Sequence, residues 1–219
     1  MGFTPPVAPT LTQILTAQGL NVPASADYTT FLHNAADFAY AAPDGLGIAK
    51  LFSSDSISGR YTTAGVFGSG KTVVAKIRGS ADSFAGPGLL LRDPVLGVYQ
   101  TITCRVSGQT WRSYQFSAAD NFVAEPAAAV NMIQRDVGTG WWFKAADDTV
   151  NITYYVSYDA SPNGEPSAWR TLWTIPRRNY NGSNTGLGVT GWTQVGISAY
   201  GFAIGGAGTA GVLESLRVF

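Results

Sequence analysis

The chain of 219 residues carries 14 basic and 14 acidic side chains, and charged residues make up only 13% of it. This balance lacks the basic excess that holds a phosphate backbone, so we do not expect nucleic-acid binding. One Cys and one His exclude an intrachain disulfide and a metal site built from these residues, and we predict no metal and no cofactor. The start of the chain lacks a signal-peptide pattern, and no run of about 18 apolar residues predicts membrane insertion.

The first 45 residues differ in pattern from the rest of the chain. Three prolines among the first nine residues favour an extended start. Short helical turns are predicted over 10–20 and over 28–39. We interpret residues 1–45 as an N-terminal arm of little regular structure that anchors the protein to a partner.

From residue 46 onward the hydrophobic pattern has a period of two, which is typical of strands. Segments rich in Gly, Asp, Asn and Pro separate the strands, as turns require. Many strands with almost no helix predict an all-β domain over 46–219, built as a sandwich or barrel. The predicted strands are 47–54, 61–67, 72–79, 88–93, 97–107, 110–117, 140–146, 149–158, 168–175, 192–200 and 212–219.

The longest alternation, over 149–158, separates an apolar from a polar face. Ile152 and Tyr154 fall on one face and Tyr155 falls on the other. We expect the first face to pack into a core and the second to be polar. The same phase puts Cys104 on a core face, so we interpret its thiol as a buried apolar side chain rather than a reactive one.

Several segments follow the order of strands and motifs of a known superfamily. Residues 72–102 read as strand, loop, "GLLLRD" and strand, and 141–175 as aromatic strand, Asp turn, long strand and Trp. The segments WTQVGISAYG and VLESLRVF match its last two strands. Over about residues 60–219 the chain thus resembles the concanavalin A-like lectin/glucanase superfamily, which includes laminin-G-like jelly rolls. The resemblance implies a two-sheet antiparallel jelly roll and no particular substrate, because this fold has many functions.

The segment GVFGSGKT, residues 65–72, matches the pattern of a phosphate-binding P-loop. A P-loop needs a helix after it, whose N-terminus holds the phosphates. The next residues, VVAKIRG, are β-branched and alternating, which favours a strand. We therefore predict a hairpin here and keep nucleotide binding as the less favoured alternative.

Paired carboxylates for glycoside hydrolysis are not evident. The three Glu residues, at positions 125, 165 and 214, are far apart in sequence, and Asp147–Asp148 fits a turn. His33, the sole His, is interpreted as structural. We therefore assign no catalytic residue. Oxygen atoms in 159–165 (Asp159, Asn163 and Glu165) have the chemistry of a calcium site, but ordinary loop polarity is favoured.

The polar face of the sheet is the candidate binding surface. Aromatic rings stack on sugars, and Arg and Lys donate to hydroxyl or carboxylate groups; the same mixture suits a protein interface. By strand phase this face combines Lys76, Arg78, Tyr99, Arg105, Trp142, Lys144, Tyr155 and Arg170.

Low charge, an arm and the lack of catalytic motifs predict a non-enzymatic structural or decoration protein on the surface of a phage virion. Its expected partners are other virion proteins, further copies of itself, or a cell-surface glycan. The first alternative is a carbohydrate-binding, receptor-recognition module. The second is a glycan hydrolase of the same fold.

Overall fold

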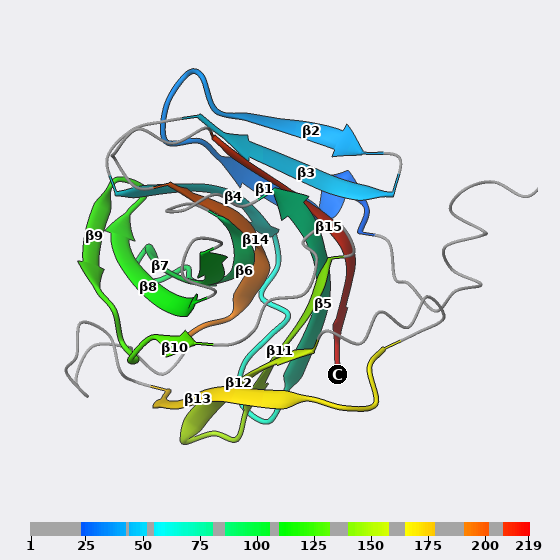
Figure 1. Ribbon diagram of the computed structural model, residues 1–219, viewed down its shortest axis with the longest axis vertical. Coiled ribbons are helices and arrows are strands. Elements are labelled where there is room, and N and C mark those ends of the chain that lie inside the picture. Colours follow the sequence, from blue (N-terminus) through cyan, green and yellow to red (C-terminus); the bar gives the residue numbers. More distant parts are fainter. Residues whose placement is uncertain are drawn as a thin grey trace, which may run out of the picture.

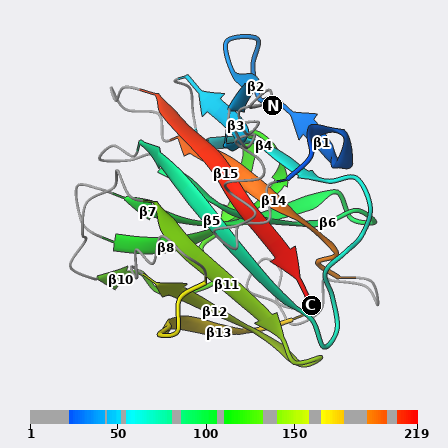
Figure 2. The same cartoon turned by 90° about the vertical axis from the view of Figure 1, so that its right-hand side faces the viewer.

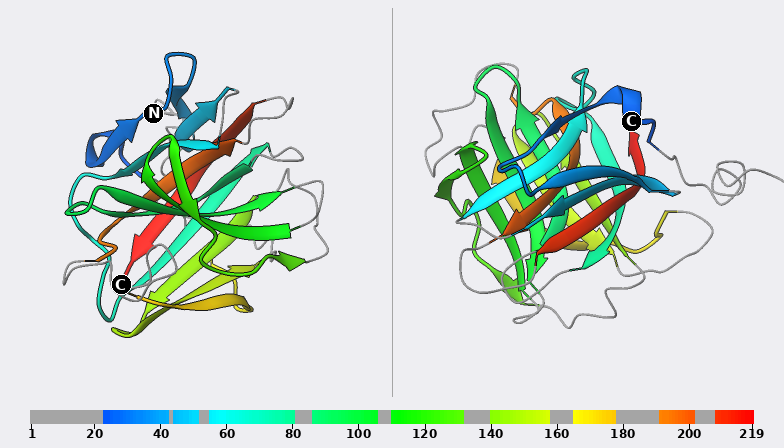
Figure 3. Two further views of the ribbon diagram at one scale, coloured as in Figure 1. Left: turned by 90° about the vertical axis from the view of Figure 1, so that its left-hand side faces the viewer. Right: turned by 90° about the horizontal axis from the view of Figure 1, so that it is seen from above.

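The computed structural model describes residues 23–42, 44–51, 55–80, 86–105, 110–131, 140–157, 165–177, 191–201 and 208–219. These residues form two antiparallel sheets that pack face to face (Figure 1). The predicted two-sheet jelly roll is confirmed. In the left view of Figure 3 the green strands β7 and β8 of the eight-stranded sheet lie across the strands of the seven-stranded sheet. Among the described residues, no helix has the length and apolar character needed to cross a membrane.

One sheet has eight strands, of which seven follow one another in hydrogen-bonded order and β9 pairs with β8. The order is β1 (Tyr28–Phe31), β4 (Ser56–Thr62), β14 (Gln194–Gly201), β6 (Gly86–Asp93), β7 (Val98–Arg105), β8 (Thr110–Ala118) and β10 (Val130–Asn131); β9 is Asn121–Ala124.

The other sheet has seven strands, and β15 runs through its middle between β5 and β3 (Figure 2). The order is β13 (Arg170–Pro176), β12 (Asn151–Ser157), β11 (Trp141–Asp147), β5 (Thr72–Ser80), β15 (Thr209–Val218), β3 (Gly45–Lys50) and β2 (Phe38–Ala42).

Strands β1 and β2 lie within the segment that we predicted to be an arm. β1 pairs with β4, with Tyr28 opposite Thr62, and β2 pairs with β3. The helical turns predicted over 28–39 are wrong, because strand pairing in the sandwich outweighs a weak local preference for helix. Only one short 3₁₀ turn, η1 (Ser25–Asp27), precedes β1 within the described part of the chain. The rest of the predicted arm, residues 1–22, lies outside the described residues.

The main core fills the space between the two sheets. Its members come from alternate positions of each strand, for example Leu89 and Leu91 of β6, and Ile152 and Tyr154 of β12. Cys104 is buried in this core, as predicted, and burial raises the pKa of its thiol to about 12. The thiol is therefore protonated and unreactive at neutral pH.

The eight-stranded sheet curls strongly, and its concave face holds a second, smaller core (Figure 1). The rings of Tyr114 on β8 and Tyr200 on β14 stack at 4.3 Å, although β6 and β7 lie between these strands in the sheet. The N–H of Ile57 on β4 donates to Ala119 O in the β8–β9 turn at 2.8 Å. These contacts bring opposite sides of the sheet together, so its own side chains fill this part of the concave face.

Candidate functional site

Five of the eight predicted binding residues lie together on the outer face of the seven-stranded sheet. β5 contributes Lys76 and Arg78, β11 contributes Trp142 and Lys144, and β12 contributes Tyr155. Register confirms the common face, because Trp142 lies opposite Lys76, and Lys144 lies opposite Tyr155. Their neighbours in sequence point into the main core.

The other three predicted residues lie elsewhere, so the predicted eight-residue surface is wrong as a single site. Tyr99 and Arg105 belong to β7 of the eight-stranded sheet. Arg170 lies opposite Val156, a core residue, and is exposed at the start of the edge strand β13. Strand alternation tells which face a side chain shares with its neighbours, but it does not tell which sheet the strand joins.

Two of the three predicted basic residues on this outer face form ion pairs. Lys76 Nζ lies 3.0 Å from Glu214 Oε2, and Arg78 Nε lies 2.6 Å from Glu214 Oε1. Arg78 also contacts Asp44 at 2.5 Å. A β-bulge in β15 between Leu213 and Ser215 positions Glu214 to contact both Lys76 and Arg78. Glu214 and Asp44 thus neutralise Lys76 and Arg78.

The aromatic residues of this face are similarly engaged. Lys144 Nζ lies over the rings of Tyr155 and Trp169, at 4.3 and 4.6 Å from their centroids. Burial lowers the pKa of Lys144. Trp142 is only 2% exposed and packs with Val74 and Trp169. The buried Trp142 therefore stabilises the fold, whereas the rings of Tyr155 and Trp169 are partly exposed and hold the Lys144 ammonium.

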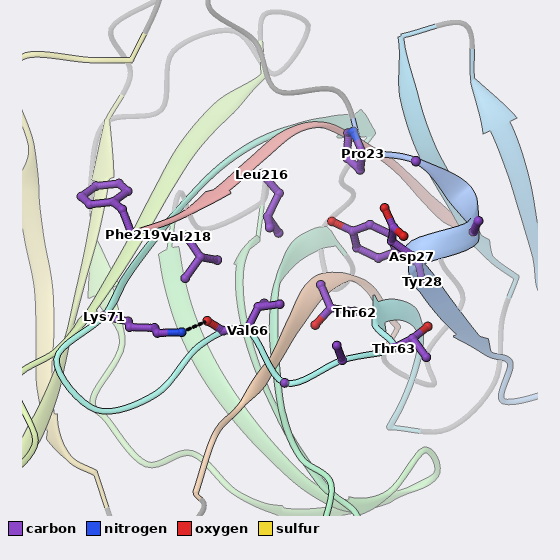
Figure 4. Close-up of a pocket in the computed structure, with 14 residues that line it drawn as sticks. Pro23, Asp27, Tyr28, Thr62, Thr63, Val66, Lys71, Leu216, Val218 and Phe219 are labelled. Carbon is purple, nitrogen blue, oxygen red and sulfur yellow. Dashed lines mark hydrogen bonds between the residues drawn. The ribbon is translucent and has the colours of Figure 1, made fainter.

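A cleft of about 950 Å³ opens at one end of the sandwich (Figure 4). Its walls come from η1 and the start of β1, from residues 62–66 and Lys71 between β4 and β5, and from the end of β15. Figure 4 shows Lys71 and Phe219 on one side, and Asp27 and Tyr28 on the opposite side. Three segments that are distant in sequence therefore build the cleft.

The β4–β5 connection contains the segment 65–72, and it is not the hairpin that we predicted. β4 and β5 belong to different sheets, so this segment passes from one sheet to the other. The N–H groups of Val66 and Phe67 both donate to Thr193 O, and the Phe67 side chain is buried. The segment ends in strand β5 instead of a helix, so the phosphate-binding geometry of a P-loop is not formed.

Two glycines allow the sharp course of this connection. Gly68 and Gly70 have φ values of 137° and 75°, which residues with a side chain rarely adopt. Lys71 N–H donates to Gly68 O, and Lys71 Nζ donates to Val66 O at 2.9 Å. The turn therefore directs the exposed Lys71 side chain along the cleft wall.

The cleft combines apolar surface with groups that donate and accept hydrogen bonds. Phe219 is 61% exposed, and Thr63 and Asp27 are exposed polar residues. Tyr28 is half-buried, and burial raises the pKa of its hydroxyl, an effect to which Asp27 adds. The phenol is therefore a neutral donor at physiological pH. Asp27 is the one acidic side chain among the cleft-lining residues that the structure describes.

The remaining acidic candidates have structural roles. Asp147 Oδ1 accepts from Thr149 N–H, and Asp148 Oδ1 accepts from the N–H groups of Val150 and Asn151, which confirms the predicted turn. These backbone hydrogen bonds lower the pKa of Asp148.

The Glu residues are bound in ion pairs, Glu125 with Arg112 and Glu165 with Arg217. Most of the candidate calcium segment, including positions 159 and 163, lies outside the described residues. Within the described ranges no group of three or more His, Cys, Asp or Glu residues forms a metal site.

Sequence reasoning missed most of the cleft. Asp27, Tyr28, Thr63 and Phe219 carry no local motif, and they come from parts of the chain that only the fold brings together. The one sequence signal for this region was the glycine-rich segment 65–72, which matches the pattern of a phosphate-binding P-loop.

The fold matches those of solved carbohydrate-binding and lectin domains. The carbohydrate-binding module CBM66 from Bacillus subtilis is 14% identical, with a TM-score of 0.53 over 88% of this chain and 94% of that chain. The exoplasmic/lumenal domain of VIP36, bound to Ca²⁺ and Man3GlcNAc, is 10% identical, with a TM-score of 0.55 over 93% of this chain and 90% of that chain.

A xylan β-1,4-xylosidase from Bacillus halodurans is 15% identical, with a TM-score of 0.54 over 90% of this chain and 37% of that chain. No family model and no curated protein matches the sequence. At these identities the likeness shows the fold alone, which is the two-sheet jelly roll that these domains share.

Proposed function

We propose that this protein is a non-catalytic carbohydrate-binding module that holds a glycan in the cleft at the end of the sandwich. The observation that carries the proposal is the composition of the cleft: an exposed ring at Phe219, a phenol at Tyr28, and hydrogen-bonding groups at Asp27, Thr63 and Lys71. Its volume of about 950 Å³ falls within the range of small-ligand sites.

Sugar rings match such a surface in two ways. Their C–H faces pack on aromatic rings such as that of Phe219. Their hydroxyl groups donate to a carboxylate such as Asp27 and accept from an ammonium or phenol such as Lys71 or Tyr28. The relevant neighbours also support the proposal, since one is named as a carbohydrate-binding module and another is bound to Man3GlcNAc.

Binding without hydrolysis is the version that the cleft supports best. Glycosidases use two carboxyl groups on opposite sides of the scissile bond. Among the described lining residues, only Asp27 supplies an acidic side chain. The xylosidase neighbour is more than twice as long as this domain, so its activity does not transfer by fold alone.

The test is a glycan-binding screen on the full chain, followed by titration of the best oligosaccharide. Ala26 and Ala64 are exposed cleft residues, so Ala26→Trp and Ala64→Trp fill the cleft without disturbing the core. Ala118→Trp on β8, also exposed and outside the cleft lining, is the matched control. We expect the two cleft variants to weaken binding by at least about 10-fold and the control to bind normally. Unchanged binding in both cleft variants would refute this location.

The location on a phage virion, with virion proteins or further copies as partners, stays a prediction. It is compatible with a glycan-binding domain at a particle surface.

A further inference from the structure

Arg92 lies on the concave face of the eight-stranded sheet, near the cleft. It is half-buried, and its guanidinium carbon lies 4.6 Å from the ring centroid of Tyr61 and 5.6 Å from that of Tyr99. Phe31 stacks on Tyr99 at 4.7 Å. Two partly exposed rings therefore lie beside the cation, and the Phe31 ring stacks on one of them.

No carboxylate neutralises this cation. Arg78, Arg112 and Arg217 each contact an acidic side chain, whereas among the described residues Arg92 has no ion pair. Its Nη1 donates to Gln194 Oε1, and its buried Nε has no hydrogen-bond partner in the described structure. Since Nε is buried, an anion reaches this guanidinium through its two terminal nitrogens, an edge that can make two-point contact with a planar anion.

A short chain of hydrogen bonds links Arg92 to the cleft. Gln194 accepts from Arg92 and donates through Nε2 to Thr63 O at 2.9 Å. Thr63 lines the cleft, and Tyr61 precedes it by two residues at the end of β4. Arg92 on β6 is thus linked to the cleft wall through Gln194 on β14, the strand between β6 and β4.

We infer that Arg92 is the charged subsite for an anionic sugar unit of a glycan whose neighbouring units lie in the cleft. This inference rests on the proposed function and names its substrate class. Tyr61 and Tyr99 hold the guanidinium in place and offer ring surface to the sugar. Lys71, whose ammonium is bonded only to a backbone carbonyl among the described residues, is a second cation at the cleft.

The test compares ligands that differ only in charge. A galacturonic acid oligomer carries a carboxylate on each unit, and its methyl ester has nearly the same shape without the charge. Dextran sulfate and dextran of equal length provide the same comparison for sulfate. We expect the wild-type full chain to bind the acid at least about 10-fold more tightly than the ester. If the anionic group is a sulfate, the chain should instead bind dextran sulfate more tightly than dextran.

The protein variants test the position. Arg92→Gln should remove the preference for the charged ligand, and Arg92→Lys should restore part of it. Arg112→Gln changes the net charge equally, but at an arginine that Glu125 already neutralises, so it should keep the preference. Circular dichroism and the melting temperature check that each variant is folded.

Two other results separate a failure of the inference about Arg92 from a failure of the proposed function. If charged and neutral ligands bind equally and Ala64→Trp blocks both, the inference about Arg92 is wrong and the proposed function stands. If no glycan binds to the wild-type chain, both are wrong.

Discussion

The outer face of the seven-stranded sheet and the cleft end of the eight-stranded sheet carry similar residue types in opposite states. On the outer face, Lys76 and Arg78 share the carboxylate of Glu214 as a partner. At the cleft end, Lys71 and Arg92 have no carboxylate partner among the described residues. Charges that are satisfied within the chain stabilise it, whereas unsatisfied charges are available to a ligand.

The contrast also separates stability from function in this fold. Side chains on the outer face are expected to matter for unfolding and little for binding. Side chains at the cleft end are expected to show the reverse. The four predictions that follow test this separation.

The largest expected effect is that of Glu214→Gln. This change leaves Lys76 and Arg78 without the carboxylate that both contact. We expect the unfolding free energy to fall by about 2 kcal/mol. This loss is smaller than that of a fully buried pair, because Arg78 is 41% exposed. Urea unfolding measures it, with Glu125→Gln at a more exposed pair as the control, where we expect less than about 1 kcal/mol. Equal losses in the two variants would contradict the special role of Glu214.

Lys144→Met gives a pH-dependent effect. Burial lowers the pKa of Lys144 in the folded state, so the unfolded chain binds this proton more tightly. Stability therefore rises with pH as the pH approaches the unfolded value of 10.5. At each pH, the unfolding free energy of the Met variant is subtracted from that of the wild type. The contributions of the other titrating groups then cancel. The wild-type advantage in unfolding free energy should be greater at pH 10 than at pH 7, and a smaller advantage at pH 10 would overturn the assignment.

Arg92→Gln should have a small effect on stability. The substitution removes contacts with two half-buried rings and one hydrogen bond, and we expect a loss of less than about 1 kcal/mol. Thermal unfolding measures it. A loss as large as that of Glu214→Gln would show that Arg92 is a structural residue, and the comparison between the two regions would fail.

The smallest effect on stability is expected for Ala64→Trp. The residue is exposed, so the new side chain lies in the cleft and the change in unfolding free energy should stay within about 0.5 kcal/mol. Its effect should be on glycan binding alone. A marked drop in the melting temperature would mean that the cleft is part of the packed structure.

The sequence predicted most of the sandwich because long alternating strands carry a strong signal. The strand predicted over 72–79 is β5, and that over 110–117 is β8. β1 and β2 were missed because they are short, with four and five residues, and take their structure from pairing with β4 and β3. Local pattern carries little information about such segments.

The candidate site was much harder to predict. Strand phase placed Lys76 and Lys144 on one face, and the structure confirms this. It also grouped Tyr99 with them, although β7 belongs to the other sheet. The cleft was not predictable, because Asp27 and Phe219 are brought to the same cleft only by the pairing order of the strands.

Backbone amide chemical shifts, measured while the best-binding oligosaccharide from the screen is added to the full chain, test the central claim most directly. The proposed site predicts that the largest shift changes occur around residues 24–28, 62–66, 71 and 218–219. Changes centred on Trp142, Lys144 and Tyr155 would instead place the glycan on the outer face of the seven-stranded sheet and contradict the account.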